Sequence, residues 1–187
     1  MHTSSPSLFS GVAPKPARAY LHRYLSAVRG TYSRCIAPRA GRFDIPILAT
    51  RAGYTPEQLF TSDNSLLPTL IGTLAAGRDP RSFNLSLTLP EPLALLQRFK
   101  TTDNPFEYVA CVIFAMRLVS ARESNPYKGM LKDELFRGWE RHLGSINAGV
   151  VEMVEALKGC SYTHTDPLDH LFGEALNAHN LVIRALI

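Results

Sequence analysis

The stretch that most constrains this chain runs from residue 44 to residue 63, DIPILATRAGYTPEQLFTSD. Ala49 and Gly53 stand four residues apart and Leu59 follows Gly53 by six, as in two short helices joined by a tight turn. A small residue in the first helix allows close packing, and glycine accepts the positive φ of the turn. The pattern predicts a helix-turn-helix, although an ordinary corner between two helices explains it equally well.

Capping residues support both predicted helices. Asp44 can cap the first helix, with Pro46 tolerated in its first turn. Thr55 can cap the second helix, Pro56 would take its first position, and Gln58 would complete a capping box. The local sequence therefore favours helix on both sides of the turn.

Basic charge is concentrated in the same part of the chain. Residues 1–60 contain eight Lys or Arg against two acids, a net charge of +6. The remainder contains 12 Lys or Arg against 14 acids, a net charge of −2. Neutralisation of phosphates would require positive charge beside a DNA-binding element. For any single arginine, a solvated surface position is the alternative.

Hydrophobic periodicity predicts a helical chain. The expected helices cover residues 16–36, 65–76, 92–100, 105–122, 130–143, 146–158 and 167–186, besides the two in the corner. The first is amphipathic through Tyr20, Tyr24, Val28 and Tyr32. Apolar residues alternate between Phe83 and Leu89 as in a strand, but no second such run exists to pair with it. Residues 78–90 are therefore expected to form an extended connector.

The pattern L48-A49-x-x-A52-G53-Y54-T55-P56-x-x-L59-F60, followed by an apolar helix from Leu66, resembles the DNA-binding half of the TetR family of transcriptional repressors. The order of elements after it is similar to that family's effector and dimer domain. The resemblance covers most of residues 16–187. It implies an all-α fold of about nine helices, with an N-terminal three-helix helix-turn-helix head and a C-terminal helical bundle. The expected divisions are a flexible arm (1–15), a DNA-binding domain (16–64) and a ligand-binding and dimerisation domain (65–187).

In a helix-turn-helix the second helix enters the major groove and its outward side chains meet base edges. Gln58 could pair with adenine, and Glu57 could accept a hydrogen bond from cytosine. The outward candidates are Tyr54, Thr55, Glu57, Gln58 and Thr61. The candidate phosphate contacts are Arg18, Arg39, Arg42 and Arg51.

The bundle offers a candidate ligand pocket with an apolar lining and a few polar groups. Its residues are Phe106, Tyr108, Cys111, Phe114, Met116, Trp139 and His142, each of which is otherwise an ordinary core residue. The resemblance implies a small apolar or amphipathic effector in this bundle. Packing of residues 146–158 and 167–186 against a second copy would give a homodimer, which presents two recognition helices to a palindromic operator in double-stranded DNA.

Motifs for catalysis and metal binding are missing from the sequence. It contains no nucleophile elbow, P-loop, GxGxxG or HExxH pattern. Cys160, His164, His170 and Glu174 are of metal-ligand types, but their spacing matches no standard zinc pattern. We therefore expect no enzyme, no metal site and no cofactor.

These observations predict a cytoplasmic DNA-binding transcriptional regulator, a repressor released by its effector. Three widely spaced cysteines suit reduced thiols in the cytosol, and no apolar run has the length of a membrane span. One alternative is an all-helical protein-interaction module or secreted effector, whose acid-poor N-terminus is a targeting or export signal and which does not bind DNA. Another is a family member whose head no longer reads DNA.

Overall fold

The computed structural model describes residues 15–87, 93–122, 136–166, 169 and 178–183. The chain divides into two compact units. One unit consists of Phe9–Arg78 and Met153–Ile187 and contains a β-sheet. The other consists of Met1–Leu8 and Asp79–Glu152, and its described part is helical. The functional boundary expected between residues 64 and 65 stays a prediction, because this division reflects packing alone.

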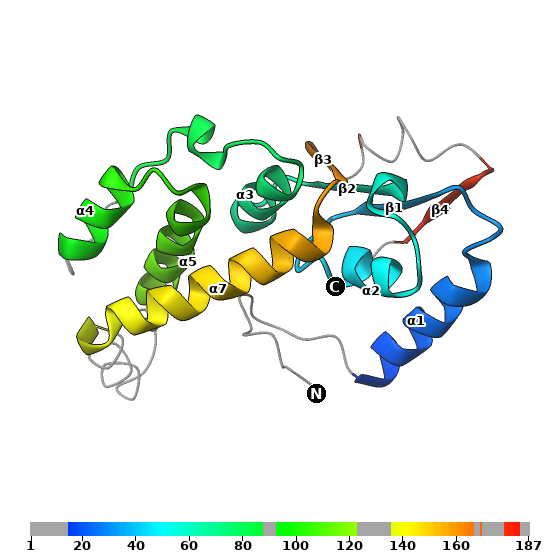
Figure 1. The fold of residues 1–187 in the computed structure, drawn as a ribbon, viewed down its shortest axis with the longest axis horizontal. Coiled ribbons are helices and arrows are strands. Elements are labelled where there is room, and N and C mark those ends of the chain that lie inside the picture. Colours follow the sequence, from blue (N-terminus) through cyan, green and yellow to red (C-terminus); the bar gives the residue numbers. More distant parts are fainter. Residues whose placement is uncertain (1–14, 88–92, 123–135, 167–168, 170–177, 184–187) are drawn as a thin grey trace. The chain divides into compact units, whose positions relative to one another are not determined.

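The sheet contains four parallel strands in the order β3-β2-β1-β4 (Figure 1). Their bounds are Arg34–Pro38 for β1, Leu59–Asp63 for β2, Ser161–His164 for β3 and Asn180–Val182 for β4. Cys35 of β1 aligns with Leu59 of β2 on one side and Leu181 of β4 on the other. Parallel strands are buried on both faces, and accordingly Cys35, Ile36 and Ala37 are each at most 1% exposed.

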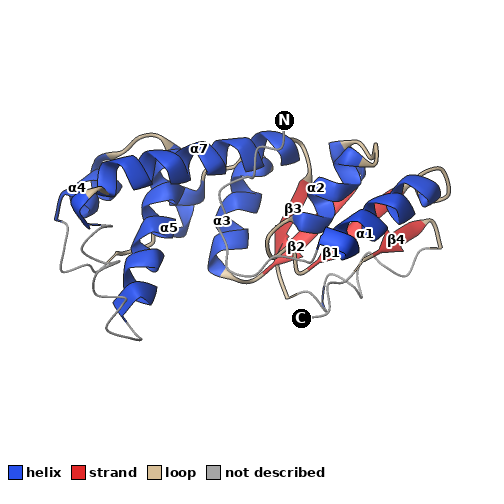
Figure 2. Ribbon diagram, turned by 90° about the horizontal axis from the view of Figure 1, so that it is seen from below, coloured by secondary structure: helices blue, strands red, loops and turns tan. Residues whose placement is uncertain are grey.

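Among the described residues, three α-helices lie wholly within the sheet unit: α1 (Lys15–Val28), α2 (Asp44–Arg51) and α3 (Leu66–Ala75). Figure 2 shows α1 and α2 side by side over the sheet, and the two helices are in contact. The third helix packs against β2 and β3. It is apolar along most of its length and almost wholly buried, as expected of a helix without a solvent-facing side.

The helical unit contains α4 (Leu93–Thr101), α5 (Pro105–Arg122) and the first part of α7 (Trp139–Leu157). A 3₁₀ turn, η2 (Pro80–Phe83), precedes them. The Phe99 and Tyr108 rings stack with centroids 4.7 Å apart and join α4 to α5. The middle of α5 is fully buried, because it is apolar on every side.

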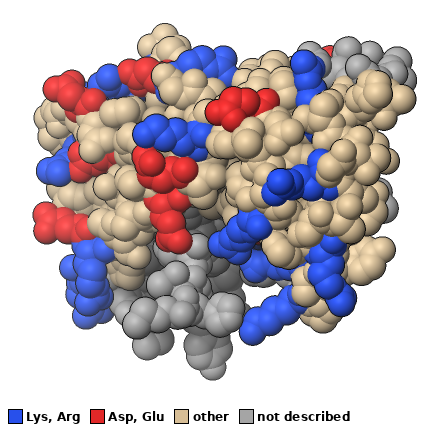
Figure 3. Space-filling model, turned by 45° about the vertical axis from the view of Figure 1, so that its right-hand side comes forward, with Lys and Arg blue, Asp and Glu red and all other residues tan. Residues whose placement is uncertain are grey.

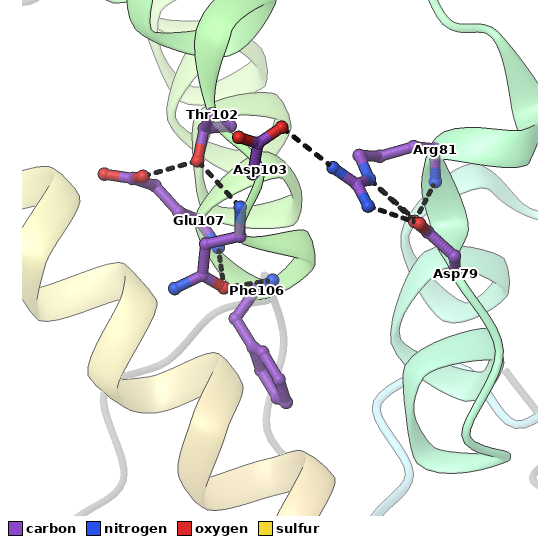
Figure 4. A network of polar contacts seen from close by, with 7 residues as sticks. Asp79, Arg81, Thr102, Asp103, Phe106 and Glu107 are labelled. Atoms are coloured by element: carbon purple, nitrogen blue, oxygen red, sulfur yellow. Dashed lines mark hydrogen bonds and ion pairs between the residues drawn. The ribbon is translucent and has the colours of Figure 1, made fainter.

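Polar contacts fix the start of α5 (Figure 4). The Asn104 side-chain oxygen accepts a hydrogen bond from the Phe106 amide at 3.0 Å and so caps the helix. The Thr102 hydroxyl donates to Glu107 at 2.6 Å. Arg81 forms ion pairs with Asp79 at 2.7 Å and with Asp103 at 3.7 Å. These contacts tie η2 to the segment between α4 and α5.

The all-α prediction is wrong, because the chain forms a parallel sheet. The helix expected over 16–36 ends at Val28, and Arg34–Pro38 is β1, one of the two inner strands of the sheet. Each strand has five residues or fewer. Parallel strands carry no hairpin signal and are too short here for alternation to stand out from helical periodicity.

The predicted helix-turn-helix is half right. Its first helix is α2, and Gly53 has the expected positive φ of 97°. Its second helix is absent, since Pro56–Gln58 is a single 3₁₀ turn, η1, that leads directly into β2. The Gln58 side chain does accept a hydrogen bond from the Thr55 amide at 2.9 Å, but the capping contact closes a turn instead of starting a helix.

The remaining predicted helices have mixed outcomes. Those over 65–76, 92–100 and 105–122 are confirmed as α3, α4 and α5. The helices expected over 130–143 and 146–158 are one continuous helix from Trp139 to Leu157, while residues 123–135 lie outside the described residues. The terminal helix expected over 167–186 is wrong at Asn180–Val182, which is β4, and much of the rest lies outside the described residues.

Candidate nucleotide-binding edge of the sheet

The carboxyl ends of β1 and β2 lie side by side at one edge of the sheet (Figure 1). From β1 the chain continues through α2 to β2 on one side, whereas β4 pairs with β1 on the other side. In open α/β sheets, ligands bind outside the carboxyl ends of the strands, where the strand order reverses. The candidate site is therefore the edge that follows Pro38 and Asp63.

The loop after β1, residues 39–43, has an unusual backbone. Arg39, Gly41 and Phe43 have φ of 60°, 49° and 59°, whereas Ala40 and Arg42 do not have positive φ. Left-handed conformation is uncommon for residues other than glycine and is a real outlier for a bulky side chain such as that of Phe43. Such conformations persist only where the surroundings hold them, and they cluster at functional sites.

Two contacts hold the loop in this conformation. The Ala40 amide donates to the carbonyl of Ser62 at 2.8 Å, which attaches the loop to the end of β2. The Phe43 amide donates to the carbonyl of Ala40 at 2.7 Å. Phe43 itself is completely buried, and its ring lies 6.3 Å from that of Tyr162, centroid to centroid. Burial of the phenyl ring thus anchors the loop to the core.

Asp63, the last residue of β2, connects the two loops at this edge. Its Oδ2 accepts a hydrogen bond from the Gly41 amide at 2.9 Å, across 22 residues of sequence. Its Oδ1 accepts from the Ser65 amide at 2.7 Å. Hydrogen bonds to an ionised acceptor are about twice as strong as neutral ones. The carboxylate therefore fixes both the loop after β1 and the start of α3.

The end of β3 extends this edge. His164 aligns with Asp63 in the sheet, and its Nδ1 lies 3.0 Å from the Thr69 hydroxyl oxygen. The Tyr162 hydroxyl donates to the Asp63 carbonyl at 2.9 Å and lies 3.1 Å from the same threonine oxygen. Burial of Tyr162 raises the pKa of its phenol to about 12. It is therefore a neutral donor at physiological pH and supports the backbone of β2 from beneath the edge.

The residues predicted to contact DNA come from several elements of the sheet unit, and two of them are buried. Arg39 and Arg42 lie in the loop after β1, and Arg42 pairs with Asp44 at 3.6 Å. Tyr54 is 3% exposed, and Thr61 is buried within β2, where its hydroxyl donates to the Ser161 carbonyl. The others are spread over α1, the end of α2 and the η1 turn, as Arg18, Arg51, Thr55, Glu57 and Gln58. Contact of any of them with DNA stays a prediction.

The predicted ligand-binding residues all belong to the helical unit, on α5 and α7. Cys111 and Phe114 are completely buried, whereas Met116 is 40% exposed. The Phe114 and His142 rings stack with centroids 6.4 Å apart, and Tyr108 stacks on Phe99. The other two, Phe106 and Trp139, are half-buried. These contacts describe helix packing, and binding of an effector stays a prediction.

Sequence reasoning missed the loop at residues 39–43 and Asp63. A signal for them was present, because Gly41 and Asp63 have the spacing found between a phosphate-binding turn and the acid that follows the second strand. The signal has meaning only if Arg34–Pro38 is a strand, and that segment was predicted to belong to a helix.

The four parallel strands in the order β3-β2-β1-β4, with α2 between β1 and β2, define an α/β protein with a Rossmann-like sheet. The chain belongs to the family described as phage DNA adenine methylase-like domain 1, whose model matches residues 9–185. Comparison with curated proteins and with solved structures gave no match.

Family membership corrects the functional predictions. The resemblance to TetR regulators is wrong, as are the repressor function and the alternative of an interaction module or secreted effector. The expectation that the protein is not an enzyme is overturned as well, because the family is named for a methylase. A DNA partner agrees with that name, whereas no observation supports an effector, a homodimer or a palindromic operator. In the described part of the chain, no helix is long and apolar enough to cross a membrane.

Proposed function

We propose that this protein acts in the methylation of adenine in DNA, and that the carboxyl edge of β1 and β2 binds the adenosine part of the methyl donor, S-adenosylmethionine. One observation carries the proposal: the hydrogen bond between Asp63 and Gly41 joins the two segments that bind a nucleotide in sheets of this kind. Membership of the DNA adenine methylase-like family supports the reaction class.

The residues at this edge fit an adenosine. In Rossmann-like sheets an acid about 20 residues beyond the turn binds the ribose hydroxyls, and Asp63 has the corresponding position. A carboxylate oxygen can accept two hydrogen bonds, and each oxygen of Asp63, a residue that is 4% exposed, accepts one backbone amide. A ribose hydroxyl would donate the second hydrogen bond. Asn64, which is exposed and follows directly, supplies an amide group at the same edge.

The chemistry follows from the donor and the target base. When bound, S-adenosylmethionine supplies a methyl group on a positively charged sulfur, which adenine N6 can attack while the carbon–sulfur electron pair returns to sulfur. The amine then loses one proton. The role of the residues at the edge is to bind and orient the donor, since correct positioning of two reactants removes much of the entropic barrier. Asp63 would fix the ribose, and the loop at residues 39–43 would fix the adjoining part of the donor.

Calorimetric titration of the full chain with S-adenosylmethionine and with S-adenosylhomocysteine tests the site. We expect both to bind, and we expect Asp63→Asn to weaken binding about tenfold, the value of one hydrogen bond to a charged group. Asp103→Asn is the matched control, because Asp103 is a fully exposed aspartate in the helical unit. Absence of binding by the unmodified chain would overturn the proposal.

A thermodynamic cycle that combines the Asp63→Asn variant with an altered ligand distinguishes a direct contact from a change in loop structure. A donor analogue without ribose hydroxyls should bind more weakly than the donor to the unmodified chain. On the Asp63→Asn variant, the analogue and the donor should bind with about equal affinity, because the contact with the ribose is already lost. Equal losses in both proteins would contradict a role of Asp63 in ribose binding. Appearance of N6-methyladenine in DNA incubated with protein and donor, measured by mass spectrometry of the nucleosides, tests the transfer itself.

A further inference from the structure

One face of α1 exposes two aromatic rings. Tyr20 is 67% exposed and Tyr24 is 40% exposed, although both are large side chains that folding would normally bury. They are four residues apart, which places them one above the other on the helix. Arg23 and Ala27 are exposed and share the face by the same three- and four-residue spacing. We call these four residues the tyrosine face of α1.

The surroundings of the tyrosine face are basic. The helix contains Lys15, Arg18 and Arg23 and no acidic residue. None of the three forms an ion pair with an acid in the described part of the chain. In Figure 3, Lys and Arg side chains gather where α1 lies, with no Asp or Glu among them. The helix packs on α2 through its other side, where Leu25 is completely buried.

We infer that the tyrosine face of α1 binds a DNA strand with unpaired bases. The positive charge suits phosphates, and exposed tyrosines are platforms on which unpaired bases stack. The inference rests on the proposed function, because an enzyme that acts on a base in DNA extrudes that base from the duplex and leaves bases without partners. An acidic protein partner would use the same cations but would gain little from two stacked phenol rings. The combination of charge and rings therefore favours DNA.

Fluorescence anisotropy with an end-labelled single-stranded oligonucleotide, and with the matching duplex, tests the inference. We expect the full chain to bind the single strand more tightly than the duplex. Replacing both rings (Tyr20→Ala with Tyr24→Ala) should weaken single-strand binding by at least about fivefold, the lower range for loss of one stacked base. The salt dependence should stay unchanged, because no charge is removed.

Arg23→Gln should have the complementary effect. It should weaken binding and reduce the slope of log affinity against log salt by about 0.7, the value for one phosphate contact on a single strand. The controls are Lys100→Gln, an exposed cation on α4, and Val151→Ala, which is 38% exposed on α7. Neither should change the affinity for DNA. All of these side chains are on the surface, so thermal unfolding midpoints should be unchanged.

The outcomes separate this inference from the proposed function. Unchanged DNA binding in the tyrosine and Arg23 variants, or no DNA binding at low salt, would overturn the inference. The proposed binding of S-adenosylmethionine would not be affected by that result. The opposite outcome is loss of DNA binding in these variants while neither they nor the unmodified chain bind S-adenosylmethionine. It would support DNA binding by the tyrosine face and overturn the proposed donor site. An equal loss for single strand and duplex in the tyrosine variant would also contradict stacking on unpaired bases.

Discussion

The ring of Tyr162 lies directly against Gly72, so that a Cβ atom added to this glycine would overlap the ring atoms. Gly72 lies within α3 and Tyr162 lies on β3, and the contact brings helix and strand closer than any other residue at position 72 permits. The same tyrosine donates its hydroxyl hydrogen bond to the Asp63 carbonyl. The glycine therefore sets the position of a side chain that supports the candidate site.

Gly72→Ala should destabilise the sheet unit. An extra methyl group in a closely packed core typically costs about 1–3 kcal/mol, although alanine is intrinsically the better helix former. Urea unfolding followed by circular dichroism measures the change. Gly72→Ala should cost less in a Tyr162→Val background than in the unmodified chain, because the smaller side chain leaves room for the methyl group. An unchanged midpoint in Gly72→Ala would contradict the packing described here.

The hydroxyl of Tyr162 should make stability depend on alkaline pH. Burial raises its pKa from 10.0 to about 12, so the folded state holds the proton more tightly than the unfolded state. This contribution is fully present below pH 10 and is lost as pH rises toward 12, with a magnitude on the order of 2 kcal/mol. The free energy of unfolding should therefore fall over that interval more steeply in the unmodified chain than in Tyr162→Phe. Parallel pH profiles for the two proteins would exclude this assignment.

Gly53 and Gly144 form a matched pair of substitutions. Gly53 has φ of 97°, and a Cβ atom there would also meet the guanidinium of Arg29. Gly53→Ala should therefore cost about 1 kcal/mol or more. Gly144 lies within α7 with open space around it, so Gly144→Ala should be neutral or stabilise by up to about 1 kcal/mol. Thermal unfolding should show a lower midpoint for Gly53→Ala and an unchanged or higher midpoint for Gly144→Ala.

Acid should weaken the start of α5 through Glu107. The Thr102 hydroxyl, together with the Arg98 guanidinium at 2.7 Å, holds the pKa of this carboxyl below its ordinary value of 4.5. A depressed folded-state pKa gives stability that is present above 4.5 and is lost as pH falls below it. Glu107→Gln should remove this part of the acid sensitivity and cost about 1–2 kcal/mol near pH 7. Urea unfolding at pH 3 and pH 7 should show the smaller difference in the variant.

The three thiols should resist alkylation while the protein is folded. Cys35, Cys111 and Cys160 are each at most 2% exposed. Burial raises the pKa of the first two to about 12 and of Cys160 to about 11, so almost no thiolate is present at pH 8. Iodoacetamide should modify all three only after unfolding in guanidinium, which intact-mass spectrometry can follow. Rapid reaction of any one thiol in the native protein would contradict its burial.

Long apolar helices were predictable from the sequence, and short parallel strands were not. The segment that became α3 is apolar over ten residues and ends before a glycine, so its pattern fits only one element. The pattern of the corner at residues 44–63 fits two different structures. A helix, a glycine and a Thr-Pro start occur in a helix-turn-helix and also where a helix returns to a parallel strand. Tertiary pairing of Leu59–Asp63 with β1 decides between them, and local sequence does not contain that pairing.

The candidate site was hidden for the same reason. Gly41 and Asp63 are both visible in the sequence, but their relationship depends on two strands that end side by side. The excess of Lys and Arg in residues 1–60, by contrast, was visible from the sequence, because a count of charged residues does not depend on the fold. Its interpretation as the phosphate-binding flank of a recognition helix lost its basis, because a 3₁₀ turn and β2 take the place of that helix.

The inner strand β1 pairs with two strands that are far apart in the chain, since β2 follows after 20 residues and β4 comes only at Asn180–Val182. During synthesis on the ribosome, the first half of the sheet emerges well before its remaining strands. Pairings over such long sequence separations form slowly and leave unpaired strand edges exposed in the meantime. A nascent chain halted before residue 180 should therefore be prone to aggregation or proteolysis, because β1 then lacks its pairing with β4.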